Sequence, residues 1–170
     1  MLAQLFGLTN RILGATPGYA HCDVPCGIYD PHAAQIAALT VIRMNQLIAG
    51  LAAPANPGDK AAMDVYANTL SRYIATKEAH AELVKKEVTI IMGDYFRPEH
   101  AEKYPTLMSN AWNILKLSSR NKQNVDAAAA NELLAEVQKF SETFWDSKGV
   151  ATKKQPSNQT VGGELVVPAN

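Results

Sequence analysis

The chain has 170 residues, the length of one domain with tails, and 47% of them are hydrophobic, which is enough for a packed core. Its 16 basic and 16 acidic side chains give a formal net charge of zero, which argues against a strongly basic nucleic-acid binder and a highly charged disordered chain. No apolar run approaches the roughly 20 residues of a membrane-spanning helix, and two cysteines are too few for a disulfide-rich scaffold.

The first segment, residues 1–20, has apolar positions at helical spacing, but Arg11 interrupts them. A secretion signal needs a basic start and an uninterrupted apolar run of about 7–15 residues, and neither is present. A short amphipathic helix and a removable leader peptide that is not a secretion signal therefore both remain possible for this segment taken alone. Gly18, Tyr19 and Ala20 resemble a processing site of small residues.

The next segment, residues 21–31, reads HCDVPCGIYDP. Pro25, Gly27 and Pro31 are incompatible with a continuous helix, so we predict a compact loop. It contains both cysteines of the chain, Cys22 and Cys26.

Residues 32–148 carry apolar side chains at three- and four-residue steps, which is typical of amphipathic helices. Asp59 is placed to cap the second helix, and Pro98 and Pro105 make residues 94–105 a connection. The helices are predicted at about 32–51, 60–93, 106–119 and 125–147. The last of them has an apolar stripe made of Ala130, Leu133, Val137, Phe140 and Phe144. The pattern predicts an all-α fold, an antiparallel up-and-down four-helix bundle.

The last segment, residues 149–170, is polar and rich in Gly, Pro, Ser and Asn. This composition predicts a flexible C-terminal tail.

The loop at residues 21–31 has the donors for a metal site if the mature chain begins at His21. The new α-amine, the Cys22 backbone nitrogen and the Cys22 thiolate then bind one metal through two fused five-membered chelate rings. Cys26 adds a fourth donor, because Pro25 and Gly27 let the chain fold back. Two nitrogens and two thiolates in one plane suit Ni(II), and an axial His21 imidazole favours a higher oxidation state. This chemistry requires the removal of residues 1–20, which we therefore interpret as a leader.

The HCDVPCGIYDP segment resembles the nickel-binding hook of the nickel superoxide dismutase family. The further stretches that match, in the same order, are AELVKKE (81–87), DYFRPEHAEKYP (94–105) and FWDSK (144–148), so the resemblance covers about residues 21–148. It implies a four-helix bundle assembled as a homohexamer, with leader removal by a dedicated peptidase. It also implies an enzyme that converts two superoxide ions and two protons to dioxygen and hydrogen peroxide by Ni(III)/Ni(II) cycling. We expect a cytoplasmic protein with no nucleic-acid or membrane partner.

The resemblance also implies residue roles. One nickel ion per chain would be held by the His21 amine and imidazole, the Cys22 backbone nitrogen and thiolate, and the Cys26 thiolate. The positions expected around a small access pocket, where they would orient water, restrict entry and support proton delivery, are Asp23, Tyr29 and Tyr95.

Two positions depart from the better-known family pattern. A glutamate on the first helix and an arginine on the second normally hold the axial imidazole, and the matching positions here are Ala37 and His80. The restraint on the imidazole must therefore differ, since groups around the ligands set their orientation. Our hypothesis is that His80, from this or a neighbouring subunit, or a backbone carbonyl replaces it.

Two other interpretations use the same residues. A nickel or copper carrier with an N-terminal hook would bind metal without catalytic loss of superoxide. A secreted helical module would instead join Cys22 and Cys26 in a disulfide. The matching helical stretches and the poor secretion signal favour the enzyme.

Overall fold

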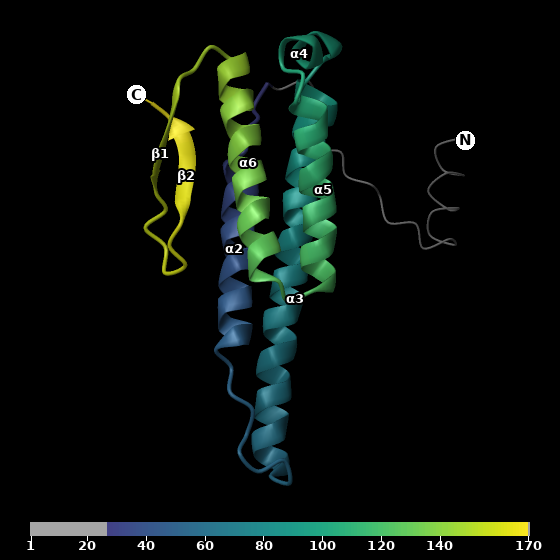
Figure 1. Ribbon diagram of the computed structural model, residues 1–170, viewed down its shortest axis with the longest axis vertical. Helices are drawn as coiled ribbons and strands as arrows, with labels where there is room; N and C mark the ends of the chain where they lie inside the picture. The colour runs from purple at the N-terminus through teal and green to yellow at the C-terminus, as the bar shows by residue number, and fades with distance from the viewer. Residues whose placement is uncertain (1–26, 170) are drawn as a thin grey trace, which may run out of the picture.

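The computed structural model describes residues 27–169. The predicted leader at residues 1–20 and most of the predicted hook, residues 21–26, lie outside that range. Within it, four long helices run side by side, alternately up and down (Figure 1). They are α2 (His32–Ala49), α3 (Lys60–Ile90), α5 (Leu107–Gln123) and α6 (Ala127–Ser147). Each helix packs on the next, and α6 returns to α2, so the predicted antiparallel four-helix bundle is confirmed.

The helix caps and the buried apolar faces agree with those predicted from the sequence. The Asp59 side chain caps α3 by accepting a hydrogen bond from the Ala62 backbone N–H at 3.1 Å. Asp126 caps α6 in the same way through the Ala129 N–H at 2.9 Å. The apolar stripe expected on α6 is fully buried in the core. Among the helices of residues 27–169, none is both long and apolar enough to cross a membrane.

One helix boundary differs clearly from its prediction. The polar residues after position 119 were expected to end the third helix, but α5 continues to Gln123. The reason is a set of buried polar contacts: Asn121 is fully buried, and its Nδ2 donates to the backbone oxygens of Leu117 and Ala129. A polar side chain can thus occupy a core position when its amide donor finds backbone acceptors, although Asn121 Oδ1 is buried without a partner among the described residues.

The predicted connection at residues 94–105 contains structure of its own. Helix α3 passes directly into a π-helical turn, η1 (Ile91–Tyr95), and a short helix follows, α4 (Pro98–Lys103). Pro98 is the first residue of α4, where a missing N–H does no harm. Together η1 and α4 close the end of the bundle at which α2 begins (Figure 1).

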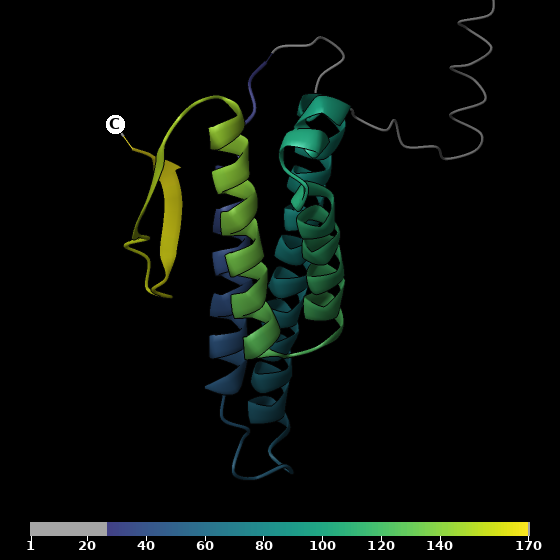
Figure 2. The same ribbon diagram turned by 45° about the horizontal axis from the view of Figure 1, so that its top comes forward.

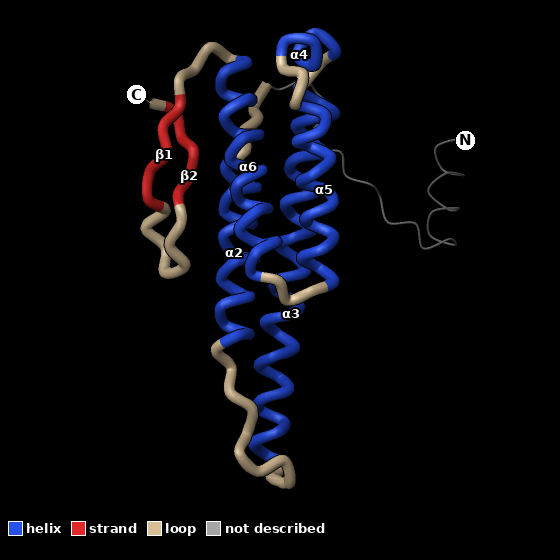
Figure 3. Tube along the Cα trace, in the orientation of Figure 1, coloured by secondary structure: helices blue, strands red, loops and turns tan. Residues whose placement is uncertain are grey.

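The prediction of a flexible C-terminal tail is wrong for residues 152–168. They form an antiparallel hairpin of β1 (Thr152–Pro156) and β2 (Glu164–Pro168), which lies along the outside of α2 and α6 (Figures 2 and 3). Leu165 and Val166 are buried, and the Gln35 side chain exchanges two hydrogen bonds with the Val166 backbone. A short apolar strand with a long-range partner therefore orders a segment whose overall composition is polar.

Candidate metal centre

The described chain begins just after the predicted nickel ligands. Gly27, the residue that follows Cys26 in the sequence, has a φ of +70°, a left-handed conformation that favours glycine. From there the chain passes Tyr29 and enters α2, where the His32 backbone N–H donates to Asp30 Oδ1 at 2.8 Å. The predicted ligands His21, Cys22 and Cys26, and the predicted pocket residue Asp23, lie outside the described residues.

The two predicted tyrosines are brought together from distant positions in the sequence. The rings of Tyr29 and Tyr95 lie 5.9 Å apart between centroids, and both are partly buried against the core. Tyr29 lies in the loop before α2, whereas Tyr95 is the last residue of η1. The fold therefore places Tyr95 beside the segment that follows the predicted hook.

Tyr95 is the centre of a wider group of rings, which we call the bundle-end aromatic cluster. Its ring lies 4.8 Å from Phe144, 5.1 Å from Phe96 and 5.6 Å from His100, between centroids. The His100 ring stacks on it at an interplanar angle of 23°. The members of the cluster are Tyr29, Tyr95, Phe96, His100 and Phe144. Dense ring packing restricts the freedom of Tyr95 to a small range of orientations.

Polar contacts fix the atoms at the edge of this cluster. The Tyr95 hydroxyl oxygen lies 2.7 Å from Ser147 Oγ, and Ser147 donates to the Phe144 backbone oxygen at 2.6 Å. His100 Nδ1 accepts from the Arg97 backbone N–H at 3.0 Å, so a neutral His100 ring carries its hydrogen on Nε2. Sequence reasoning did not find Ser147 or His100 for this site, although both belong to stretches that match the family.

A lysine adds positive charge to the same end of the bundle. Lys148 Nζ lies 5.3 Å from the Tyr95 ring centroid and 5.0 Å from that of Phe144, within the range of cation–π attraction. It also lies 5.9 Å from the Trp145 ring. Sequence reasoning did not find Lys148, because no spacing rule links positions 95 and 148.

The two positions that depart from the family pattern lie deeper in the bundle. Ala37 is buried in the core at 1% exposure and offers no polar side-chain atom. His80 Nδ1 donates to the Thr76 backbone oxygen at 2.8 Å, which leaves Nε2 for another partner. His80 precedes the end of α3 by ten residues, about 15 Å along the helix axis. Its role in holding the His21 imidazole stays a prediction.

The described residues do not form a metal site by themselves. Between positions 27 and 169, no group of three or more His, Cys, Asp or Glu side chains is arranged to hold a metal ion. The donor chemistry of the predicted hook would fit nickel, because thiolate sulfurs and amine, amide and imidazole nitrogens are ligands that this ion accepts.

The sequence of the chain is similar to those of known proteins. The family model of nickel-containing superoxide dismutase matches residues 16–148. The superoxide dismutase [Ni] of Streptomyces coelicolor is 35% identical over 129 residues, which are 76% of this chain and 88% of the relative. That of Streptomyces seoulensis is 32% identical over 148 residues, 87% of this chain and 98% of the relative.

Solved structures of nickel superoxide dismutases have a similar fold. A native nickel superoxide dismutase superposes with a TM-score of 0.63 at 34% identity, covering 75% of this chain and 99% of that chain. A mutant nickel superoxide dismutase gives 0.64 at 33% identity and covers 76% and 99%. The hairpin of β1 and β2 lies after residue 148, where the match to the family model ends. The relatives are superoxide dismutases, so the matches do not favour a metal carrier without turnover. By sequence and by fold, the chain is a member of the nickel-containing superoxide dismutase family.

Proposed function

We propose that this chain is the precursor of a superoxide dismutase whose mature form begins at His21. The reaction converts two superoxide ions and two protons to dioxygen and hydrogen peroxide. The observation that carries the proposal is the HCDVPCGIYDP segment, which leads without interruption to Tyr29 and its contact with Tyr95. A metal-binding sequence and a confined aromatic site are thereby joined at one end of a rigid bundle.

The proposed ligands are His21, Cys22 and Cys26. The His21 α-amine and imidazole, the Cys22 backbone nitrogen and thiolate, and the Cys26 thiolate supply the donors. When bound, nickel supplies the one-electron couple that the two halves of the reaction need. The α-amine becomes available only when the peptide bond before His21 is cut, so a processing peptidase is a required partner.

The proposed roles of the other site residues concern binding and protons. In this proposal the rings of Tyr29 and Tyr95, whose centroids lie 5.9 Å apart, restrict entry to small molecules. Their hydroxyls orient water in the site. The Asp23 carboxylate, two residues after His21, supports delivery of the protons that peroxide formation consumes.

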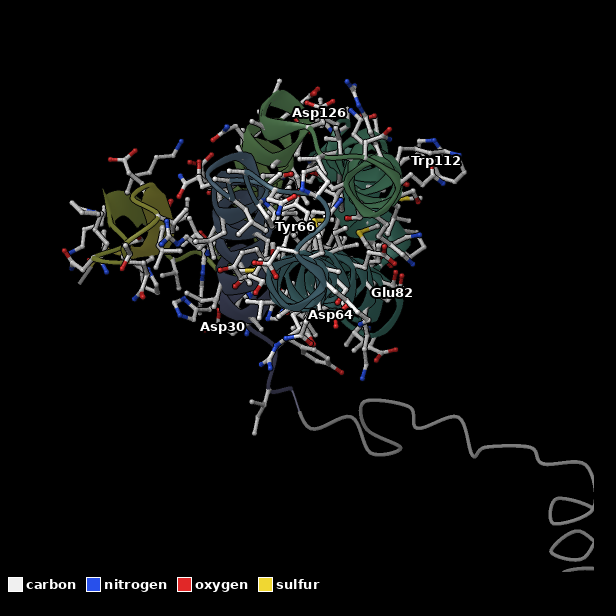
Figure 4. The ribbon with its side chains drawn as sticks, turned by 90° about the horizontal axis from the view of Figure 1, so that it is seen from below. Asp30, Asp64, Tyr66, Glu82, Trp112 and Asp126 are labelled. Carbon is white, nitrogen blue, oxygen red and sulfur yellow. The ribbon has the colours of Figure 1, made fainter. Side chains whose placement is uncertain are left out.

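We further propose that the mature protein is a cytoplasmic homohexamer. Thiolate ligands remain reduced in that compartment, which supports the location. The outer face of α5 exposes Met108 and Trp112 by 60% and 61%, which supports an assembly that covers them. Trp112 points away from the bundle, on the side opposite the hairpin (Figure 4). Native mass spectrometry of the mature protein measures the number of subunits.

The test of the function uses three samples: the processed chain, the chain with residues 1–20 retained, and a processed Cys22→Ser, Cys26→Ser double variant. Intact mass should report a start at His21 and metal analysis about one nickel per processed chain. Pulse radiolysis should then detect catalytic loss of superoxide only in that sample. Stoichiometric nickel without superoxide loss would identify a carrier, and equal activity in all three samples would exclude the hook.

A further inference from the structure

Ser147 connects the bundle-end aromatic cluster to the end of α6. It is the last residue of that helix, and its Oγ lies 2.7 Å from the Tyr95 hydroxyl oxygen and 2.6 Å from the Phe144 backbone oxygen. Both distances are those of good O–H···O hydrogen bonds. The Ser147 oxygen therefore contacts the Phe144 carbonyl, which only accepts hydrogen bonds, and the Tyr95 hydroxyl, which either donates or accepts them.

The direction of both hydrogen bonds follows from counting hydrogens. A serine hydroxyl has one hydrogen, and a backbone carbonyl has none to give. The Ser147 hydrogen must therefore point to the Phe144 oxygen, since two bare oxygens at 2.6 Å would repel each other. The bond between Tyr95 and Ser147 is then made with the phenol hydrogen, so Tyr95 is the donor.

The helix end explains why the Phe144 oxygen needs this partner. The last carbonyls of a helix lack intrahelical donors. The backbone N–H of Lys148 bonds to Trp145 and that of Gly149 bonds to Asp146, so neither reaches Phe144. The Ser147 hydroxyl satisfies that carbonyl, and this requirement keeps the serine hydrogen away from Tyr95.

We propose that Ser147 is a positioning residue that holds the Tyr95 phenol hydrogen and turns the lone pairs of the phenol oxygen toward the substrate site. The inference rests on the proposed function, in which Tyr95 lines that site. Stacking on His100 and contact with Phe144 already hold the ring, so Ser147 decides only the rotation of the hydroxyl. Tyr95 thus accepts a hydrogen bond from water or from the protonated product, and the proton itself must come from another group.

The first test needs no nickel. The full chain is labelled with ¹³C at tyrosine Cζ, and the Tyr95 signal is assigned by its loss in Tyr95→Phe. Ser147→Ala should shift this signal, because the phenol loses its acceptor, and Ser147→Thr should restore it. The matched control is Ser141→Ala, another α6 serine, whose Oγ donates to the Val137 oxygen at 2.8 Å. The control should leave the Tyr95 signal in place.

The second test is a double-mutant cycle on the rate of superoxide loss by the processed, nickel-loaded enzyme. Ser147→Ala should slow the reaction by about two- to tenfold, the worth of one hydrogen bond. Adding Ser147→Ala to Tyr95→Phe should slow it no further, whereas Ser141→Ala should leave the rate unchanged. An equal slowing in both backgrounds, or an unmoved Tyr95 signal, would overturn the assignment. An inactive wild type would instead refute the proposed function, because the Tyr95 signal is measured independently.

Discussion

Lys77 is a charged side chain that lies inside the bundle, at 1% exposure. Its Nζ donates to the backbone oxygen of Asn121 at 2.6 Å and also to that of Asn124. These carbonyls belong to the C-terminal end of α5, where acceptors lack helical partners and the helix dipole is negative. Burial lowers the pKa of Lys77, and the neighbouring Glu78 carboxylate opposes that shift. The ammonium group thus caps α5 from within the core.

Replacing Lys77 should therefore make the folded protein less stable. Lys77→Met keeps most of the volume but leaves the carbonyls unpaired, so the free energy of unfolding should fall by about 2–4 kcal/mol in urea denaturation. The matched control is Lys86→Met, at an exposed position of the same helix, which should change it by less than about 0.5 kcal/mol. Similar effects of the two substitutions would contradict the capping role.

The stability of helix α6 depends on the charge of its N-cap residue, Asp126. The Ala129 backbone N–H donates to Asp126, and the Arg120 guanidinium pairs with the same carboxylate at 2.6 Å. The Ala129 hydrogen bond, helped by Arg120, lowers the pKa of Asp126. A lowered carboxyl pKa stabilises the folded state at pH values above the ordinary pKa of about 3.9. This stabilisation is lost as the pH falls through the lowered pKa.

Two variants separate the cap from its charge. Asp126→Ala should lower the Tm at pH 7 by about 2–4 °C, because it removes an N-cap. Asp126→Asn keeps a capping oxygen, so its Tm difference from wild type should shrink on acidification from pH 6 to pH 2. Asp64→Asn, which alters an exposed pair with Lys60, is the control and should change the Tm less at pH 7. A Tm difference for Asp126→Asn that stays constant with pH would refute the argument.

The hairpin of β1 and β2 is attached to the bundle by Gln35, which is fully buried. Gln35 Nε2 donates to the Val166 backbone oxygen at 3.0 Å, and the Val166 N–H donates to Gln35 Oε1 at 2.7 Å. A buried side-chain amide thus satisfies both backbone groups of one strand residue. The hairpin is consequently part of the folded domain and adds to its stability.

Gln35→Leu should leave both Val166 groups buried without partners and lower the free energy of unfolding by about 2–4 kcal/mol. Hydrogen exchange at the Val166 amide should quicken at the same time. Gln46→Leu is the matched control, since Gln46 makes a single long contact of 3.5 Å to the Val161 oxygen of the hairpin. If exchange at Val166 were equally slow in both variants, Gln35 would not hold the strand.

These elements explain which parts of the fold could be predicted from the sequence. The four helices follow from apolar periodicity and from caps such as Asp59, which act locally. The last turn of α5 and the hairpin depend on Lys77 and Gln35, whose partners are 44 and 131 residues away. The positions of Tyr29 and Tyr95 came from the resemblance alone. Ser147 was missed at that site, because only the folded chain brings it to Tyr95.

On the scale of the whole molecule, the charge gives the substrate anion no general attraction. Removing residues 1–20 removes Arg11 and no acidic residue, which leaves 15 basic and 16 acidic side chains. Any steering of superoxide must therefore come from local charge. Lys148 is the cation that contacts the bundle-end aromatic cluster, with Nζ 5.3 Å from the Tyr95 ring centroid. Lys60 lies at the first residue of α3, toward the other end of the bundle (Figure 1).

The rate of superoxide loss should therefore depend on Lys148 in a salt-sensitive way. In the processed, nickel-loaded enzyme, Lys148→Met should lower the second-order rate constant about twofold at low ionic strength. The difference should vanish at high salt, because charges more than about 10 Å apart are screened at 0.1 M. The control, Lys60→Met, removes the same charge at the opposite end of α3, about 45 Å along the helix axis. It should leave the rate constant unchanged. Pulse radiolysis over a range of salt concentrations measures both variants, and equal slowing by the two would show that net charge, rather than Lys148, guides the anion.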